Sequence, residues 1–220
     1  MTGAMTEPEP DRRWFYLCPD DALAAPNAFV TTRIGVVPLV VQNLKGQVVA
    51  FRNVCTHRFA IIQGAAAGCG PLRCPYHGWT FDADGVPVGL PFNPTDFQLD
   101  ATGRRRLALS PASLARCGRL VFVRVALDGP SLEHQLGAET CARLSALSAA
   151  FRPPGADEDP GDGEGGDGWE RFEAANLRVA LRPGRALRLE ALPPPGAAVR
   201  VARIDRFLPV GAPAVTERPA

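Results

Sequence analysis

The sequence predicts a mainly β protein, folded as a small antiparallel barrel or sandwich, with one C-terminal helix and a short β-rich tail. Short apolar runs alternate with turn residues through the first half of the chain, and none is long enough to cross a bilayer. Helical periodicity is confined to one later segment. With 46% hydrophobic and 21% charged residues in 220, the composition is that of a globular chain and excludes a disordered one.

Strands are expected where apolar runs are bounded by turn residues. The clearest are residues 14–17, 34–42, 47–52, 79–82 and 119–126. Two turns support this pattern. Lys45-Gly46 fits a hairpin turn, and the Asp-Gly pair at the end of residues 82–85 favours the positive φ angles of a tight turn.

Residues 131–151 predict the helix, because Pro130-Ser131 supplies a start signal for an apolar stripe. The stripe consists of Leu132, Leu136, Leu144 and Leu147. Residues 153–168 are acidic and rich in glycine and proline, which predicts a mobile linker. The expected organisation is therefore a flexible tail (1–12), a domain with its helix (13–152), the linker (153–168) and a remnant (169–220) with strands at 185–192 and 199–208.

The charge and the N-terminus exclude several classes of function. A formal net charge of +1 gives no whole-protein field for nucleic acid, so no nucleic-acid partner is expected. Residues 1–13 are polar and acidic, without the apolar core of a secretory signal. We therefore expect a cytoplasmic protein with no membrane association, in which the six cysteines are thiols or metal ligands.

The most informative pattern is Cys55-x-His57, a spacer of sixteen residues, and Cys74-x2-His77. It uses two of the three histidines of the chain, each beside a cysteine. Two mixed pairs from two short loops suit either a binuclear centre or one tetrahedral ion. Zinc remains an alternative, although structural zinc sites commonly use Cys-Cys or His-His knuckles. A Rieske-type [2Fe–2S] cluster places two cysteines on one iron and two histidines on the other, which fits a duplicated mixed pair better.

Around these residues the sequence resembles a known family. Cys55-Thr56-His57-Arg58 and Cys74-Pro75-Tyr76-His77-Gly78-Trp79-Thr80-Phe81 are similar to the two cluster loops of the Rieske domain in ring-hydroxylating oxygenase α subunits. The resemblance runs from about Trp14 to about Gly137. It implies a Rieske-type fold with a cluster-binding subdomain, in which Cys55, His57, Cys74 and His77 hold one [2Fe–2S] cluster.

The resemblance also has consequences for the surroundings of the cluster. It implies that Trp79 packs near the cluster, with Arg58 and Tyr76 beside it, and that backbone amides donate to the sulfurs. In cytochrome bc-type Rieske proteins a second cysteine in each loop forms a disulfide. Ala60 and Tyr76 stand at those places, so no bridge is expected. Phe59 stands where the family usually has glycine, which threatens the tight path of the first loop.

A family oxygenase also needs a mononuclear iron held by two histidines and a carboxylate. Only His134 remains for it, so no such site is expected, and His134 is interpreted as a solvated helix residue. We interpret Cys18, Cys117 and Cys141 as isolated thiols and Cys69 as a buried or loop thiol. Residues 104–106, three arginines in a row, predict a solvated strand edge or a docking patch for an acidic redox partner.

Three functions follow as hypotheses. The first is a one-electron carrier of the oxidoreductase class, with a reductase or ferredoxin as donor and an oxygenase subunit as acceptor, and with a homo-oligomer as one arrangement. The second is a non-catalytic binding or regulatory module that uses the metal centre as a structural staple. The third is a truncated oxygenase subunit. Whether the chain is itself an enzyme stays open at this point.

Overall fold

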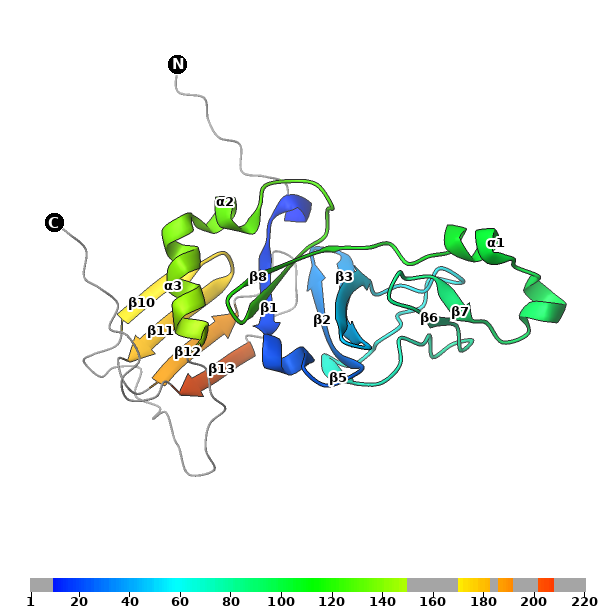
Figure 1. Cartoon of the computed structure of the whole chain (residues 1–220), viewed down its shortest axis with the longest axis horizontal. Coiled ribbons are helices and arrows are strands. Elements are labelled where there is room, and N and C mark those ends of the chain that lie inside the picture. Colours follow the sequence, from blue (N-terminus) through cyan, green and yellow to red (C-terminus); the bar gives the residue numbers. More distant parts are fainter. Residues whose placement is uncertain (1–9, 150–169, 183–185, 192–201, 208–220) are drawn as a thin grey trace, which may run out of the picture.

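The computed structural model describes residues 10–149, 170–182, 186–191 and 202–207. This part is mainly β, as expected, with antiparallel sheets in layers along an elongated molecule (Figure 1). The strands are β1 (Phe15–Pro19), β2 (Ala28–Ile34), β3 (Val37–Leu44), β4 (Gln47–Arg52), β5 (Ala67–Cys69), β6 (Thr80–Phe81), β7 (Pro87–Gly89), β8 (Ser113–Cys117), β9 (Leu120–Arg124), β10 (Glu170–Ala174), β11 (Leu177–Arg182), β12 (Ala186–Ala191) and β13 (Ala202–Phe207). The helical elements are η1 (Pro10–Arg12), η2 (Asp20–Leu23), η3 (Asn93–Phe97), α1 (Ala101–Arg106), α2 (Leu132–Leu136) and α3 (Ala138–Ala149). The expected tail at 1–9 and linker at 153–168 lie outside the described residues.

The middle of the molecule consists of two sheets packed face to face. One has the strand order β1-β9-β8 and the other β4-β3-β2-β5. In β9 the side chains alternate between two cores: Phe122 faces the helices, whereas Val121 and Val123 pack toward the second sheet. In β3, Val41 joins that shared core, and Val40 faces the opposite side together with both cysteines of the Cys/His motif. The second sheet therefore separates the domain core from the motif.

Hairpin geometry follows the predicted turns. Lys45 (φ 55°) and Gly46 (φ 93°) join β3 to β4. Gly85 (φ 74°) closes the β6–β7 turn, where the Asp82 carboxylate accepts hydrogen bonds from the amides of Asp84 and Val86. The strand expected at 34–42 is instead the end of β2, a turn at Gly35 and the start of β3, so that prediction was wrong in its bounds.

The single expected helix is two helices. Ser131 caps α2, as the start signal indicated, and its Oγ accepts from the His134 amide at 3.0 Å. Gly137, with φ 82°, ends α2 and starts a new direction for α3. The leucine stripe nevertheless faces the β1-β9-β8 sheet, because Leu132, Leu144 and Leu147 are buried there and Leu136 packs against them.

The tail forms the sheet β10-β11-β12-β13, of which only the last two strands were expected. Leu177 and Val179 of β11 are buried in the core shared with Trp14 and Phe122. The Asn176 side chain accepts from the backbone N–H of Tyr16 and donates to its C=O. The described part of the tail thus packs on the domain, which supplies the apolar cover that so few residues lack on their own.

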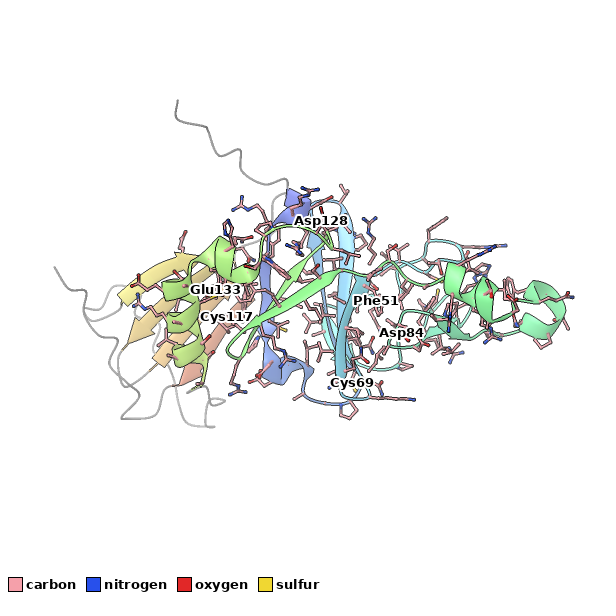
Figure 2. The ribbon with its side chains drawn as sticks, turned by 45° about the horizontal axis from the view of Figure 1, so that its top comes forward. Phe51, Cys69, Asp84, Cys117, Asp128 and Glu133 are labelled. Atoms are coloured by element: carbon pink, nitrogen blue, oxygen red, sulfur yellow. The ribbon has the colours of Figure 1, made fainter. Side chains whose placement is uncertain are left out.

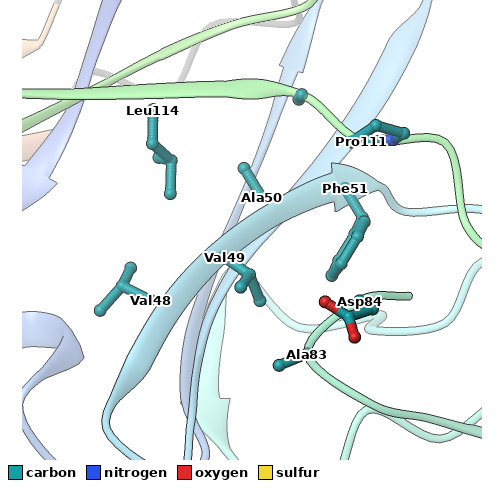
Figure 3. A pocket seen from close by; sticks show the side chains of 9 residues that line it. Val48, Val49, Ala50, Phe51, Ala83, Asp84, Pro111 and Leu114 are labelled. Atoms are coloured by element: carbon teal, nitrogen blue, oxygen red, sulfur yellow. The ribbon is translucent and has the colours of Figure 1, made fainter. Parts of the chain in front are cut away.

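Three statements about the cysteines and surface complete the fold. The described cysteines are all free thiols, and Cys69 and Cys117 lie in different parts of the molecule (Figure 2). Cys117 and Cys141 are not isolated, because the Cys117 thiol donates to the Cys141 carbonyl at 3.0 Å, and Cys69 is exposed rather than buried. A shallow groove of about 360 Å³ between β4 and the residues entering β8 is mostly apolar apart from Asp84 (Figure 3), and no residue of the Cys/His motif lines it. In the described ranges, no helix has the length and apolarity that a bilayer crossing needs.

Candidate metal centre

The first cluster loop (residues 55–60) follows β4 and is closed at its base by backbone contacts. Val54 and Ile61 form an antiparallel bridge across it. Below the bridge, buried Asn53 exchanges two hydrogen bonds with the backbone of Gln63, at 2.8 and 2.9 Å. Thr56 Oγ1 donates to the carbonyl of Leu107 at 2.6 Å, which ties the loop to the end of α1. The loop is therefore fixed at its base and on one side.

The second cluster loop (residues 74–79) repeats the hydrogen bonds of the first. In each loop the cysteine carbonyl accepts from the amide four residues later, Phe59 at 2.9 Å and Gly78 at 3.0 Å. In each, the cysteine amide donates at 2.8 Å to the carbonyl five residues later. Arg73 and Thr80 form the bridge that matches the bridge of the first loop. Two equivalent hairpins therefore present the two mixed pairs.

Phe59 and Gly78 occupy the same place in the two loops. Both have a left-handed backbone, with φ 59° for Phe59 and 74° for Gly78. Glycine adopts this conformation without strain, whereas a side chain with a Cβ does so at a cost. Phe59 thus leaves the path of the first loop intact, contrary to the concern raised by the sequence, and it carries backbone strain.

The two loops bring the predicted histidines together. The imidazole rings of His57 and His77 have centroids 4.7 Å apart in an edge-on arrangement. The indole of Trp79 stacks on His57, with centroids 4.7 Å apart and planes 5° apart. Phe97 of η3 closes the other side, since its ring stands edge-on to both His57 and Trp79 at 5.3 Å. The orientation of the His57 ring is therefore fixed by packing.

The two cysteines lie together beneath the histidines. Both are buried, and their thiols are within hydrogen-bond reach of each other. Burial raises the pKa of the Cys55 thiol, while the backbone amides of His57 and Arg58, which donate to its sulfur, act in the opposite direction. Burial also lowers the pKa of His57, with smaller contributions from His77 and Arg58. The site therefore favours neutral imidazoles, the form that binds metal.

Hydrogen bonding at the site tests whether an iron–sulfur group fits these residues. His57 Nδ1 is buried and has no hydrogen-bond partner, and the same holds for Trp79 Nε1. Buried polar atoms are rarely left unpaired, so a buried imidazole nitrogen beside two thiols is a ready metal ligand. Within the described ranges, no three His, Cys, Asp or Glu side chains converge on a point that could hold one ion. Two protein ligands to each of two metals, as in a Rieske centre, fit this arrangement.

The remaining predicted residues lie at different distances from the loops. Arg58 and Tyr76 are exposed, and the Tyr76 ring lies 4.4 Å from that of His77. His134 is exposed on α2, away from both loops. The arginines at 104–106 form the last turn of α1, so the strand edge expected there was wrong. Sequence reasoning missed Phe97, because a ring reached through forty residues of chain has no spacing signal.

With this geometry in view, the comparisons with known proteins are decisive for the domain. Residues 13–104 match the family model described as the Rieske [2Fe-2S] domain. This chain contains a Rieske domain. The domain is related to those of Rieske oxygenase α subunits, as the curated relatives show.

Two relatives illustrate this relationship. The terminal oxygenase component subunit alpha 2 of terephthalate 1,2-dioxygenase from Comamonas sp is 32% identical over 145 residues, which are 61% of this chain and 34% of that protein. Chlorobenzene dioxygenase subunit alpha from Cupriavidus sp. (strain PS12) is 30% identical over 57% of this chain and 28% of its own length. The chain with the Rieske domain therefore spans about a third or less of these relatives.

Solved structures show the same fold over more of the chain. A quaternary ammonium Rieske monooxygenase superposes with a TM-score of 0.67 over 90% of this chain and 69% of its own, at 16% identity. Naphthalene 1,2-dioxygenase from Rhodococcus sp. gives a TM-score of 0.64 over 92% of this chain and 69% of its own, at 17% identity. At such identities the likeness concerns the fold alone.

Proposed function

We propose that this Rieske chain carries single electrons from a reductase or ferredoxin toward an oxygenase. The observation that carries the proposal is the meeting of two buried thiols and two imidazoles, one mixed pair from each of two equivalent loops. The relation to oxygenase α subunits supports the choice of partners, because such proteins draw electrons from reductases or ferredoxins.

Within this proposal each residue of the motif has a role. Cys55 and Cys74 hold one iron, and His57 and His77 hold the other. When bound, the [2Fe–2S] group supplies one-electron chemistry at a potential raised by the neutral imidazole ligands. The chain buries both cysteines and leaves His77 exposed, so the histidine side of the site is the side open to a partner.

We further propose that the oxygenase iron is supplied by another polypeptide. A mononuclear site of the facial-triad type needs two histidines. These 220 residues contain three histidines, and two of them are in the mixed pairs. His134 alone remains, exposed on α2. The prediction that this chain binds no mononuclear iron is testable by iron stoichiometry.

The first experiment is analysis of the purified chain after anaerobic reconstitution with iron and sulfide. The expected result is two irons and two acid-labile sulfides per chain, with the paramagnetic resonance spectrum of a Rieske centre after reduction. A third iron would contradict the absence of a mononuclear site. Bound zinc, with no labile sulfide and no colour, would reject electron transfer and leave a structural staple.

Ligand assignment is tested by His77→Ala. Loss of one nitrogen ligand should abolish the Rieske spectrum of the reconstituted chain. The matched control is His134→Ala, which removes an exposed imidazole away from the loops and should leave the spectrum as it is. A native spectrum from the His77 variant would reject the assignment of His77.

A further inference from the structure

Phe59 is an apolar side chain that contributes no burial to the described fold. Its ring is 78% exposed, and its backbone holds the left-handed φ of 59° that glycine adopts in the second loop. Strained backbone in native proteins is concentrated at functional sites, and a large exposed aromatic costs solvation as well. Folding therefore gives no reason for phenylalanine at this place, and contact with another molecule does.

Two more exposed aromatic side chains lie on the same loops or against them. Tyr76 is 67% exposed, and its ring contacts that of His77 at 4.4 Å. Phe92, 72% exposed, follows Pro91, whose ring packs 3.3 Å from where a Cβ of Gly78 would stand. Phe59, Tyr76 and Phe92, called here the aromatic face, thus come from the first loop, the second loop and the segment packed on it. Exposed apolar groups gathered at one place mark an interaction site.

Arginines border the aromatic face. Arg58 adjoins His57 and acts electrostatically on it, and the guanidinium of Arg73 lies 3.0 Å from the place of a Gly78 Cβ. Arg105 and Arg106 are exposed in the last turn of α1, which the Thr56–Leu107 hydrogen bond ties to the first loop. Within the described part of the chain, no ion pair joins any of these four arginines to a carboxylate.

The acidic side chains of the same end are placed differently. The carboxylate of Asp100 caps α1 by accepting from the Gly103 amide at 2.7 Å, and that of Asp82 is held in the β6–β7 turn. These groups are engaged by local backbone amides, whereas the arginines beside the histidines are free to meet a partner. Unpaired cations around an apolar centre are complementary to an acidic surface, and they accelerate and orient its encounter.

We propose that the aromatic face and its arginine border bind an acidic electron-transfer protein, with Phe59 as the central apolar contact. This inference rests on the function proposed above. One electron passes from the reduced iron–sulfur group of the acidic donor to the oxidised Rieske centre. No bond is made or broken, and no proton is required. The histidine edge faces the donor because His57 and His77 lie between the two loops that carry the face.

The test uses the reconstituted full chain and an acidic [2Fe–2S] ferredoxin as the probe. Three quantities are measured: the dissociation constant of the pair by calorimetry, the rate of electron transfer by stopped-flow absorbance, and the melting temperature. Phe59→Gly should weaken binding about tenfold, as expected for loss of an interface hot spot, while the melting temperature rises. A residue that served the fold would move stability the other way.

Charge is tested by the double variant Arg73→Glu/Arg105→Glu. It should weaken binding about tenfold at low salt and remove most of the salt dependence of the association rate. The matched control is Arg116→Glu on β8, an exposed arginine in the other half of the molecule, which should bind ferredoxin as the unaltered chain does. Equal loss from the control, or no loss from the double variant, would overturn the proposal.

Two further outcomes are distinguishable. If the variants bind ferredoxin normally but convert a dimer to a monomer in sedimentation, the face joins two copies of this chain and the proposal is wrong. If the reconstituted chain has no labile sulfide and no Rieske signal, the proposed function itself has failed. Normal spectra in all variants, with ferredoxin binding unchanged, would reject only the docking face.

Discussion

The indole of Trp79 lies flat against the imidazole of His57, with planes 5° apart and ring centroids at 4.7 Å. Trp79 is among the largest fully buried side chains of the described structure, and Phe97 stands edge-on to both rings. Packing of this kind fixes a ligand ring before any metal arrives, so the orientation of His57 does not have to be gained on binding.

The first prediction concerns that stack. Trp79→Ala should destabilise the chain by about 3–5 kcal/mol, as truncation of a buried aromatic does, and should lower iron occupancy after reconstitution because the His57 ring is released. Trp79→Phe keeps an aromatic face against His57 and should lose much less of both. Denaturant unfolding and iron analysis measure the two effects. Equal losses in the two variants would show that the stack is unimportant.

Backbone strain at Phe59 gives a second prediction. Phe59→Gly should raise the free energy of unfolding by about 1 kcal/mol, since the left-handed conformation costs a residue with a Cβ about 1–2 kcal/mol and part of the gain is offset by the flexibility of glycine in the unfolded chain. Phe59→Ala, which keeps the Cβ, should leave stability nearly unchanged. Urea unfolding of the three chains separates strain from loss of the ring, and a stabilised alanine variant would contradict the strain.

Gly118, in the β8–β9 turn, gives a third. It has a φ of 57°, and a Cβ there would stand 2.2 Å from Ser148 Oγ and 2.7 Å from Ser145 Cα of α3. Gly118→Ala should therefore cost more than the roughly 1 kcal/mol of a left-handed alanine, because α3 must move off the sheet. Gly46→Ala is the control, with φ 93° and nothing near its Cβ. Melting temperatures should fall in that order, and equal falls would contradict the close contact.

Alkaline pH gives the fourth. Burial, together with Asp21 and Asp20, raises the pKa of the Cys18 thiol from 9.0 to about 12. Between these values the unfolded chain releases a proton that the folded chain retains. Stability from this group is thus complete below pH 9 and falls above it by about 1.4 kcal/mol per pH unit.

Urea unfolding of metal-free protein at pH 8 and pH 10.5 measures that fall. Cys18→Ala should show a smaller alkaline loss than the unaltered chain. Cys69→Ala removes an exposed thiol and should show the full loss. If the Cys18 variant lost as much as the Cys69 variant, the buried thiol would not be the source.

Sequence reasoning succeeded where the determinants are local. The Lys45-Gly46 turn, the Ser131 cap and the pairing of Cys55 and His57 in one loop depend on neighbours within a few residues. It failed where partners are distant. β8 has few β-branched residues and is a strand because it pairs with β9, and α1, with glycine inside it, is held by the Asp100 cap.

The candidate site divides in the same way. Spacing brought out the two mixed pairs, since each pair lies within one loop. It could not bring out the stack on His57 by Phe97, or the neighbouring thiols of Cys117 and Cys141, because these contacts are made by the packing of separate elements.

The grip of Asn176 on Tyr16 joins positions 160 residues apart, and β1 is an outer strand of its sheet. During synthesis, β1 leaves the ribosome long before Asn176 does, so its outer edge stays available to strands of other chains for most of that time. Such open edges are where β proteins associate wrongly. Premature termination before Asn176 would therefore yield chains prone to aggregate, even with both loops of the metal centre complete.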